Sequence, residues 1–235
     1  MVLGKLRKQY KRAMMPIGRF LARTGLTPNM ITGLTVLVAL TSTYFFYAGS
    51  LLIGLAVMIF AIVLDMFDGA VARAADLATP FGATFDHTLD RYAEFLFLLG
   101  LMLGPAGSPG KYVPWFWGFF TLFGMIMASF SRAKAESVGG MDDCAVGLAE
   151  RQEKLLLVML GIILLAVPET NIWLQILAFF PPSASDFVIS TLDIPNILAF
   201  FVVIVGILSH ITVGQRLSYA KMQIEARSEP PSERS

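Results

Sequence analysis

The chain has 235 residues, of which 56% are hydrophobic and only 15% are charged, and its formal net charge is +1. Soluble domains carry about 25% charged residues, so this composition excludes an ordinary soluble domain and predicts a membrane protein. The near-neutral charge argues against a nucleic-acid partner, which usually requires a basic excess. The single cysteine, Cys144, cannot form an intrachain disulfide.

The first 25 residues predict an amphipathic helix that lies on the membrane surface. Apolar side chains recur at intervals of three and four residues, which places them on one helical face: Leu3, Leu6, Tyr10, Met14, Ile17 and Leu21. Basic residues, with no acid among them, occupy the remainder: Lys5, Arg7, Lys8, Lys11, Arg12, Arg19 and Arg23. Such a helix suits an anionic lipid surface. Because the basic residues continue so far, a cleaved secretory signal is the less favoured interpretation.

Apolar runs further along the chain predict six transmembrane helices, at residues 30–49, 51–64, 95–104, 113–130, 155–167 and 194–213. Thr27 and Pro28 predict the start of the first, as a capping threonine and a first-turn proline. Because a span needs about 20 residues, we expect charged helical segments at 65–73, 86–94 and 147–154 to extend the shorter runs. The apolar run at 172–180 is too short to cross a bilayer, and we expect it to be interfacial or re-entrant.

These elements predict an all-α membrane protein with six transmembrane helices preceded by an amphipathic interfacial helix. The expected divisions are the helix at 1–25, a membrane domain at 26–222 and a polar, disordered tail at 223–235. Cytoplasmic loops hold the excess of lysine and arginine in membrane proteins. With the basic N-terminus inside, the outer loops keep one of the 18 basic residues, Lys111. We therefore expect a multi-pass protein of the cell membrane, with both termini and any active site on the cytoplasmic side.

Four aspartates at the ends of the second and third predicted spans indicate a metal site. Asp65 and Asp68 are three residues apart, and Asp86 and Asp90 are four apart, so each pair shares one face of its helix. A turn at 79–82 would bring the two helices together. Carboxylates at close range repel one another unless a cation lies between them. Oxygen ligands suit hard cations such as magnesium, manganese or calcium.

An alternative interpretation is that these acids are solvated helix ends paired with Arg73 and Arg91, since charged residues commonly flank spans. A cluster of four ionisable groups at membrane depth favours a functional site instead. Gly69, Ala72 and Gly82 leave room beside the acids for a bulky ligand. The same small residues would also allow close helix packing, and the two roles are compatible.

The residues around the four aspartates match, without a gap, the pattern DxxDGxxARx8GxxxDxxxD. The fixed positions are Asp65, Asp68, Gly69, Ala72, Arg73, Gly82, Asp86 and Asp90. This pattern resembles that of the CDP-alcohol phosphatidyltransferases, and the six predicted spans and the basic amphipathic start are also similar to that family. The resemblance implies transfer of a phosphatidyl-type group from a CDP-lipid to an alcohol with release of CMP. It also implies dependence on magnesium or manganese and, usually, a homodimer.

The resemblance also implies roles for single residues. Asp65, Asp68 and Asp86 would be the main metal ligands, and Asp90 would complete the metal-binding carboxylates and act as the general base. The CDP moiety would be held by Asp68, Gly69, Ala72, Arg73 and Gly82. Two metal ions would neutralise the pyrophosphate of the CDP-lipid, as in other in-line displacements. The lipid would be CDP-diacylglycerol or CDP-archaeol, between which the sequence does not distinguish.

Three arginines on the expected cytoplasmic face, Arg132, Arg151 and Arg216, indicate a phosphorylated acceptor alcohol, because guanidinium groups suit phosphate. Each of them could instead be an ordinary positive-inside anchor. The segments around these arginines resemble phosphatidylinositol phosphate and archaetidylinositol phosphate synthases, which implies inositol 1-phosphate as the acceptor. In the actinobacterial pattern a lysine precedes an arginine, whereas Arg132 here precedes Lys134. Glycerol 3-phosphate and serine remain alternative acceptors.

A divalent-cation carrier is the competing functional class, because facing intramembrane acids also pass ions across bilayers. Carriers usually place such acids near the bilayer midplane, often in repeated halves of the chain. Here the acids cluster at one end of their spans, and the motif has no second copy. The sequence therefore favours the enzyme.

Overall fold

The computed structural model describes residues 14–141, 143–144, 146–167 and 172–228. Every regular element within these ranges is a helix, which confirms the all-α prediction. The chain forms two compact units, Met1–Ala106 and Gly107–Ser235.

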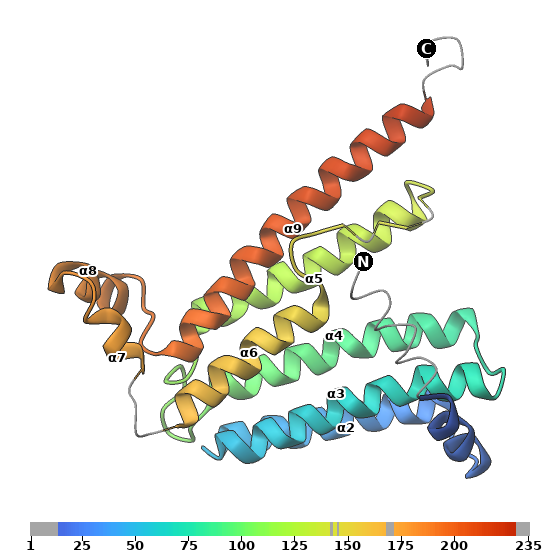
Figure 1. Cartoon of the computed structure of the whole chain (residues 1–235), viewed down its shortest axis with the longest axis horizontal. Helices are drawn as coiled ribbons and strands as arrows, with labels where there is room; N and C mark the ends of the chain where they lie inside the picture. Colours follow the sequence, from blue (N-terminus) through green and yellow to red (C-terminus); the bar gives the residue numbers. More distant parts are fainter. Residues whose placement is uncertain (1–13, 142, 145, 168–171, 229–235) are drawn as a thin grey trace. The chain divides into compact units, whose positions relative to one another are not determined.

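The first unit contains a helix at residues 14–23 followed by α2 (Pro28–Tyr47), α3 (Leu51–Ala74) and α4 (Pro80–Leu103). Helix α2 packs along both α3 and α4, and Figure 1 shows the three running side by side. Of the amphipathic helix predicted at 1–25, the last turns are therefore helical, while the first 13 residues lie outside the described ranges. Its position on a membrane surface remains a prediction.

Two of these helices begin with the same local chemistry. Thr27 caps α2 by accepting a hydrogen bond from the Met30 amide, and Thr79 caps α4 by accepting one from the Gly82 amide at 2.9 Å. A proline follows each threonine, where the missing amide hydrogen costs no helical hydrogen bond. The start predicted at Thr27 is confirmed.

The turn predicted at 79–82 is wrong in position. The chain reverses at 75–79 instead, where Asp76 adopts a positive φ of 56°. Thr79 is the cap of α4, and Gly82 already lies in its first turn. A threonine-proline pair is compatible with a turn and with a helix start, and here the capping bond made by Thr79 decides in favour of the helix.

Hydroxyl groups and glycines hold the first unit together. Ser42 of α2 donates a hydrogen bond to the Gly54 carbonyl of α3 at 2.8 Å, and Thr43 donates to the Leu96 carbonyl of α4 at 2.8 Å. A Cβ atom at Gly100 would lie 2.8 Å from the Thr43 Cα, so the α2 and α4 backbones approach closely at this point. Small residues and interhelical hydrogen bonds are the usual basis of helix association in membranes.

The second unit is built around the longest helix, α9 (Ile197–Ser228), which packs against α5 (Trp115–Ser137) and α6 (Arg151–Ala166). Short helical pieces lie between α6 and α9: α7 (Ile172–Leu177), α8 (Pro182–Asp186) and the π-helix η1 (Phe187–Thr191). Asn196 joins two parts of the unit. Its side chain accepts a bond from the Ala199 amide and donates to the Lys111 and Tyr112 carbonyls.

Polar contacts also connect α5 and α9. Thr121 donates a hydrogen bond to the Val202 carbonyl at 2.8 Å, and the Nε2 atom of His210 lies 3.2 Å from the Phe120 carbonyl. Gly206 allows this approach, because a Cβ atom there would collide with the Thr121 side chain. The second unit therefore uses the same combination of hydroxyl and glycine as the first.

Two boundaries differ from those predicted. Helix α6 begins at Arg151 rather than at residue 147, because Gly147 has a φ of +148° and the Glu150 amide donates to the Glu153 side chain at the helix start. Helix α9 continues to Ser228, six residues into the segment predicted as a polar tail at 223–235. The remainder of that segment lies outside the described residues.

Three helices in the described part of the chain are long and apolar enough to cross a membrane: Pro28–Tyr47, Leu51–Ala74 and Ile197–Arg227. Helix α6 has 16 residues, a length of roughly 24 Å against a hydrocarbon core of about 30 Å. Helix α4 has 24 residues but carries Asp86, Asp90, Arg91 and Glu94 in its first two thirds. Apolar length alone therefore supports three of the six predicted spans.

The close approach at Gly100 gives a stability prediction. We expect Gly100→Ala to lower the free energy of unfolding by about 1–3 kcal/mol, because the added methyl group would lie 2.8 Å from the Thr43 Cα and 3.0 Å from its carbonyl oxygen, and backbone atoms cannot rotate away as a side chain can. The control is Gly33→Ala in α2, where nothing lies within 4 Å of the added Cβ, and the higher helix propensity of alanine should be neutral or stabilising. Thermal unfolding of the purified protein in detergent measures both variants. Equal midpoints would contradict the packing described for α2 and α4.

Candidate functional site

The second half of α3 places the predicted site residues on one side of the helix. The intervals between these residues are one or three along the chain, a pattern that keeps all of them on one helical face. They are Asp65, Asp68, Gly69, Ala72 and Arg73. This half of α3 remains helical despite its charges because it continues directly from the apolar half, whose hydrogen-bond ladder it extends. The sequence pattern is thereby converted into a surface of acids and small residues.

Three of the four predicted carboxylates come together in space. Asp65, Asp68 and Asp86 each offer one carboxylate oxygen, and these oxygens all lie within 4.8 Å of one another. Asp68 is buried, and the other two are half-buried. Asp90, one turn further along α4, is not part of this 4.8 Å group. The structure thus assembles a three-carboxylate cluster from α3 and α4.

The residues present fit a divalent cation. The donors are all carboxylate oxygens, which magnesium and manganese prefer over nitrogen or sulfur. Three negative groups at this separation repel one another, and a cation held between them removes that repulsion. Asp65, Asp68 and Asp86 are accordingly the residues that would hold the metal.

Asp68 is oriented by a residue from outside the motif. Thr32 of α2 donates a hydrogen bond to its Oδ2 atom at 2.7 Å, in a buried setting, and the Gly69 amide donates to its Oδ1 atom. The Thr32 hydroxyl also lies 3.0 Å from the Pro28 carbonyl, but it has one proton, and a carboxylate is the stronger acceptor. Helix α2 therefore fixes the direction of a predicted metal ligand. Thr32 was not predicted from the sequence, because it lies 36 residues from Asp68 and carries only the weak signal of a hydroxyl in an apolar run.

Asp90 lies beside an ion pair that sequence analysis also missed. The Arg91 guanidinium is 2.8 Å from the Glu94 carboxylate and 3.7 Å from the Asp90 carboxylate. Glu94 is 1% exposed, an unusual burial for a carboxylate in a membrane protein and one that marks functional regions. Its four-residue spacing from Asp90 was the available signal, because it places both acids on one face of α4.

The two predicted glycines of the CDP site each have a polar neighbour. A Cβ atom at Gly69 would lie 3.1 Å from the Arg73 guanidinium, so this side chain lies over the glycine. A Cβ atom at Gly82 would lie 3.4 Å from the side-chain oxygen of Asn29 and 3.0 Å from the Thr79 hydroxyl. The start of α2 therefore meets the start of α4, and each glycine lies in close contact with polar groups.

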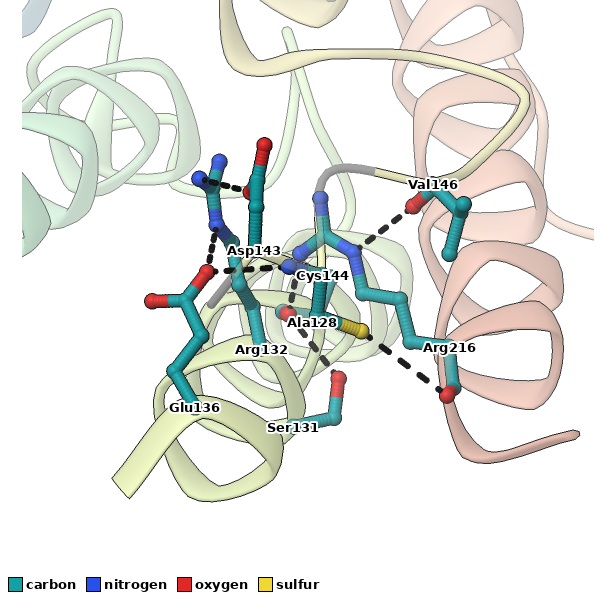
Figure 2. A network of polar contacts seen from close by, with 8 residues as sticks. All are labelled: Ala128, Ser131, Arg132, Glu136, Asp143, Cys144, Val146 and Arg216. Atoms are coloured by element: carbon teal, nitrogen blue, oxygen red, sulfur yellow. Dashed lines mark hydrogen bonds and ion pairs between the residues drawn. The ribbon is translucent and has the colours of Figure 1, made fainter. Parts of the chain in front are cut away.

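In the second unit, Arg132 and Arg216 belong to one polar network, shown in Figure 2. Arg132 pairs with Glu136 and with Asp143, each at 2.8 Å. Arg216 donates to the Val146 carbonyl at 2.9 Å and to the Ala128 carbonyl. The two arginines thus have different partners, carboxylates in one case and backbone carbonyls in the other. The third predicted arginine, Arg151, opens α6.

Cys144 lies between these arginines without a reactive environment. Its side chain is fully buried among Ala135, Met141 and Ala220, and its amide donates to Glu136 at 3.1 Å. Burial raises the pKa of the Cys144 thiol, so the thiol stays protonated near neutral pH and is a poor nucleophile. Its contribution is packing, as expected for a lone cysteine.

Comparison with known proteins identifies the family. The family model for CDP-alcohol phosphatidyltransferase matches residues 25–182, which is more than half of the chain and includes the carboxylate cluster. This chain belongs to the CDP-alcohol phosphatidyltransferase family. It is therefore an enzyme, and not the cation carrier that clustered acids also suggest.

Relatives in the family include inositol-lipid synthases. The chain is 34% identical over 166 residues to the archaetidylinositol phosphate synthase of Pyrococcus horikoshii, covering 71% of this chain and 85% of the relative. It is 35% identical over 157 residues to the phosphatidylinositol phosphate synthase of Mycobacterium tuberculosis, covering 66% of this chain and 71% of the relative.

Solved structures of the Mycobacterium tuberculosis phosphatidylinositol phosphate synthase share the fold. The CDP-DAG-bound structure has a TM-score of 0.69 and 28% identity, covering 89% of this chain and 94% of its own. The structure in complex with manganese and citrate has a TM-score of 0.68 and 26% identity, covering 94% and 92%.

Family membership and structure together define the reaction class. CDP-alcohol phosphatidyltransferases are metal-dependent membrane enzymes of phospholipid biosynthesis, and this chain carries both apolar helices long enough to cross a membrane and a carboxylate cluster that fits a metal. Its reaction transfers the lipid-bearing phosphoryl group of a CDP-lipid to an alcohol.

The contact between Thr32 and Asp68 leads to a metal-binding prediction. We expect Thr32→Val to weaken Mn²⁺ binding about 10- to 100-fold, because a ligand loses the hydrogen bond that orients it, whereas Thr32→Ser should retain most of the affinity. The matched control is Thr35→Val, since the buried Thr35 hydroxyl bonds to the Ile31 carbonyl of its own helix. Electron paramagnetic resonance of free Mn²⁺ titrated with protein measures the affinity. A similar loss in both valine variants would show that the effect is not specific to Asp68.

Proposed function

We propose that this enzyme transfers the lipid-bearing phosphoryl group of CDP-diacylglycerol or CDP-archaeol to inositol 1-phosphate and releases CMP. The observation that carries the proposal is the match to synthases named for phosphoinositol lipids, in archaea and in mycobacteria, over about two thirds of the chain. The archaeal and mycobacterial relatives differ in the lipids their names specify but agree on inositol phosphate.

Arginine chemistry supports a phosphorylated acceptor. Arg132, Arg151 and Arg216 would bind its phosphate, since guanidinium groups pair with phosphate through several charge-assisted hydrogen bonds. Two of the three lie in one network around the same loop. A neutral acceptor such as inositol or serine gives little reason to gather these charges.

The motif residues would bind the donor substrate and the metal. Two magnesium or manganese ions would be held by Asp65, Asp68 and Asp86, with Asp90. Their positive charge would offset the negative charge of the pyrophosphate. Asp68, Gly69, Ala72, Arg73 and Gly82 would hold the CDP moiety. In that arrangement the Arg73 guanidinium, which lies over Gly69, is suited to pair with a phosphate oxygen.

The proposed step is an in-line displacement at phosphorus. The acceptor hydroxyl oxygen forms a bond to the lipid-bearing phosphorus, and the bond from that phosphorus to the bridging pyrophosphate oxygen breaks. CMP departs with this oxygen and with the electron pair of the broken bond. Asp90 accepts the hydroxyl proton as the attack proceeds, which is general-base catalysis. The Arg91–Glu94 pair beside Asp90 limits the positions that its carboxylate can adopt.

The membrane arrangement that fits this function has six spans in a domain at 26–222, preceded by an interfacial amphipathic helix at 1–25. In this arrangement α4, α5 and α6 complete the spans that apolar length alone does not assign. The basic residues then face the cytoplasm, where a water-soluble acceptor is available to the active site. Two copies would form a homodimer, as the family resemblance implies.

An acceptor comparison tests the proposed function. Purified protein with CDP-diacylglycerol and Mg²⁺ or Mn²⁺ is expected to release CMP fastest with inositol 1-phosphate, and more slowly with glycerol 3-phosphate, serine or inositol. CDP-archaeol is assayed in parallel, and a chelator should abolish release in every case. Preference for glycerol 3-phosphate would retain the reaction and refute the acceptor. Preference for an unphosphorylated alcohol would also refute the phosphate-binding role of the arginines.

The roles of the aspartates can be separated by substitution. Asp90→Asn should retain CDP-lipid binding but lower kcat by about 100-fold or more, because it removes the general base. Asp65→Asn or Asp86→Asn should weaken both metal and CDP-lipid binding, because these residues belong to the carboxylate cluster. Single-turnover CMP release and equilibrium binding of the CDP-lipid distinguish the two effects. Equal loss of CDP-lipid binding in all three variants would contradict this division.

A further inference from the structure

The Arg132 guanidinium is shared between two carboxylates. Its Nε atom donates to Glu136 Oε1 at 2.8 Å, and one of its terminal nitrogens donates to Asp143 Oδ1 at 2.8 Å (Figure 2). These are charge-assisted bonds of the type that a guanidinium makes with a phosphate. Part of the phosphate-binding capacity of Arg132 is therefore occupied by side chains of the protein itself.

The two carboxylates are held very differently. Glu136 lies one turn from Arg132 on α5, its side chain is 34% exposed, and the same Oε1 atom also accepts the Cys144 amide at 3.1 Å. Asp143 comes from the loop between α5 and α6, and its side chain is 61% exposed. Glu136 is thus fixed by its helix and by a second hydrogen bond, whereas the Asp143 side chain is largely exposed to solvent.

Described residues near Asp143 are held by contacts that do not involve its side chain. Its next residue, Cys144, is fully buried and bonded to Glu136. Arg216 holds the loop again at the Val146 carbonyl. Rotation of the Asp143 side chain alone would release the Arg132 nitrogen, and the exchange would leave the backbone in place.

We propose that Asp143 is a displaceable occupant of the phosphate position on Arg132, and that Glu136 is the positioning residue that keeps the guanidinium in place. The proposal rests on the proposed function, because it takes the phosphate of the acceptor alcohol as the group that displaces Asp143. An exposed ion pair contributes little, so a phosphate dianion, with more charge and three acceptor oxygens, replaces it readily. A neutral alcohol has no group that can do so. Asp143 thereby competes with the acceptor phosphate for Arg132.

The decisive experiment compares Asp143→Ala with Glu136→Ala. Each variant removes one carboxylate that pairs with the Arg132 guanidinium. A general electrostatic effect would therefore change the KM of a phosphorylated acceptor in the same direction in both variants. Displacement predicts opposite directions. Asp143→Ala should lower the KM for inositol 1-phosphate about two- to five-fold, the range expected for loss of an exposed ion pair, and Glu136→Ala should raise it. The KM for the CDP-lipid should not change in either variant, and Glu136→Gln, which keeps an acceptor for Arg132, should partly restore the acceptor KM.

Inorganic phosphate serves as a second probe, and this test does not require the Glu136 variants to be active. As a competitive inhibitor against the acceptor, it should bind Asp143→Ala more tightly than the unmodified protein. An inhibition constant for phosphate that is unchanged or higher in Asp143→Ala would overturn the proposal. A lower acceptor KM in both Asp143→Ala and Glu136→Ala would also overturn it. Arg132→Ala separates this failure from failure of the proposed function. If it leaves the inositol 1-phosphate KM unchanged, Arg132 is not a phosphate ligand at all; if it raises that KM while Asp143→Ala has no effect, only the displacement is refuted.

Discussion

The constraint to which the rest of the first unit responds is the repulsion among three carboxylates of α3 and α4, whose oxygens lie within 4.8 Å of one another. Such a cluster opposes folding, because like charges in a poorly solvated region repel. It persists only if α3 and α4 are fixed by other contacts, and α2 supplies these. Thr32 bonds to Asp68 beside the cluster, and further along α2, Ser42 and Thr43 bond to α3 and α4. The cost of assembling the acids is therefore met by hydroxyl bonds and by glycines that let the backbones approach. A cation bound among the three carboxylates would attract each of them and so outweigh their mutual repulsion.

In both units, pairs of helices are held together by a threonine hydrogen bond and a glycine at the point of close approach. Lipid tails are as apolar as leucine, so burying leucine between helices gains little in a membrane, and association relies on close contact and hydrogen bonds. In the first unit, Thr43 and Gly100 meet across α2 and α4; in the second, Thr121 and Gly206 meet across α5 and α9. In each pair a threonine bonds to the opposing backbone and a glycine removes the atom that would keep the helices apart.

The sequence predicted features that depend on neighbouring residues and missed those that depend on distant ones. Hydropathy located α2 and α3. The three-residue spacing of Asp65 and Asp68 and the four-residue spacing of Asp86 and Asp90 placed each pair on one helical face, which indicated a carboxylate cluster between the two helices. The turn was misplaced by a few residues, because Thr79 and Pro80 suit a helix start as well as a turn. Thr32 could not be assigned to Asp68, since a threonine in an apolar helix has no local signal for a partner 36 residues away. The contact of Arg132 with Asp143 was missed for the related reason that Asp143 lies in a loop whose path no periodicity specifies.

Arg132 and Arg216 show why a shared residue type does not imply a shared electrostatic effect. Arg216 donates to carbonyl groups of Val146 and Ala128, which are neutral, so its positive charge remains uncompensated by these contacts. Arg132 faces two carboxylates, whose combined charge exceeds its own. On the proposed displacement, Arg132 gains room for an anion only when Asp143 withdraws, whereas the contacts of Arg216 with backbone carbonyls fix the loop throughout. An approaching phosphate would respond first to Arg216 and gain Arg132 only on exchange with Asp143. On this proposal, the network around the α5–α6 loop combines one arginine that is always available to an anion and one that becomes available only after Asp143 has left.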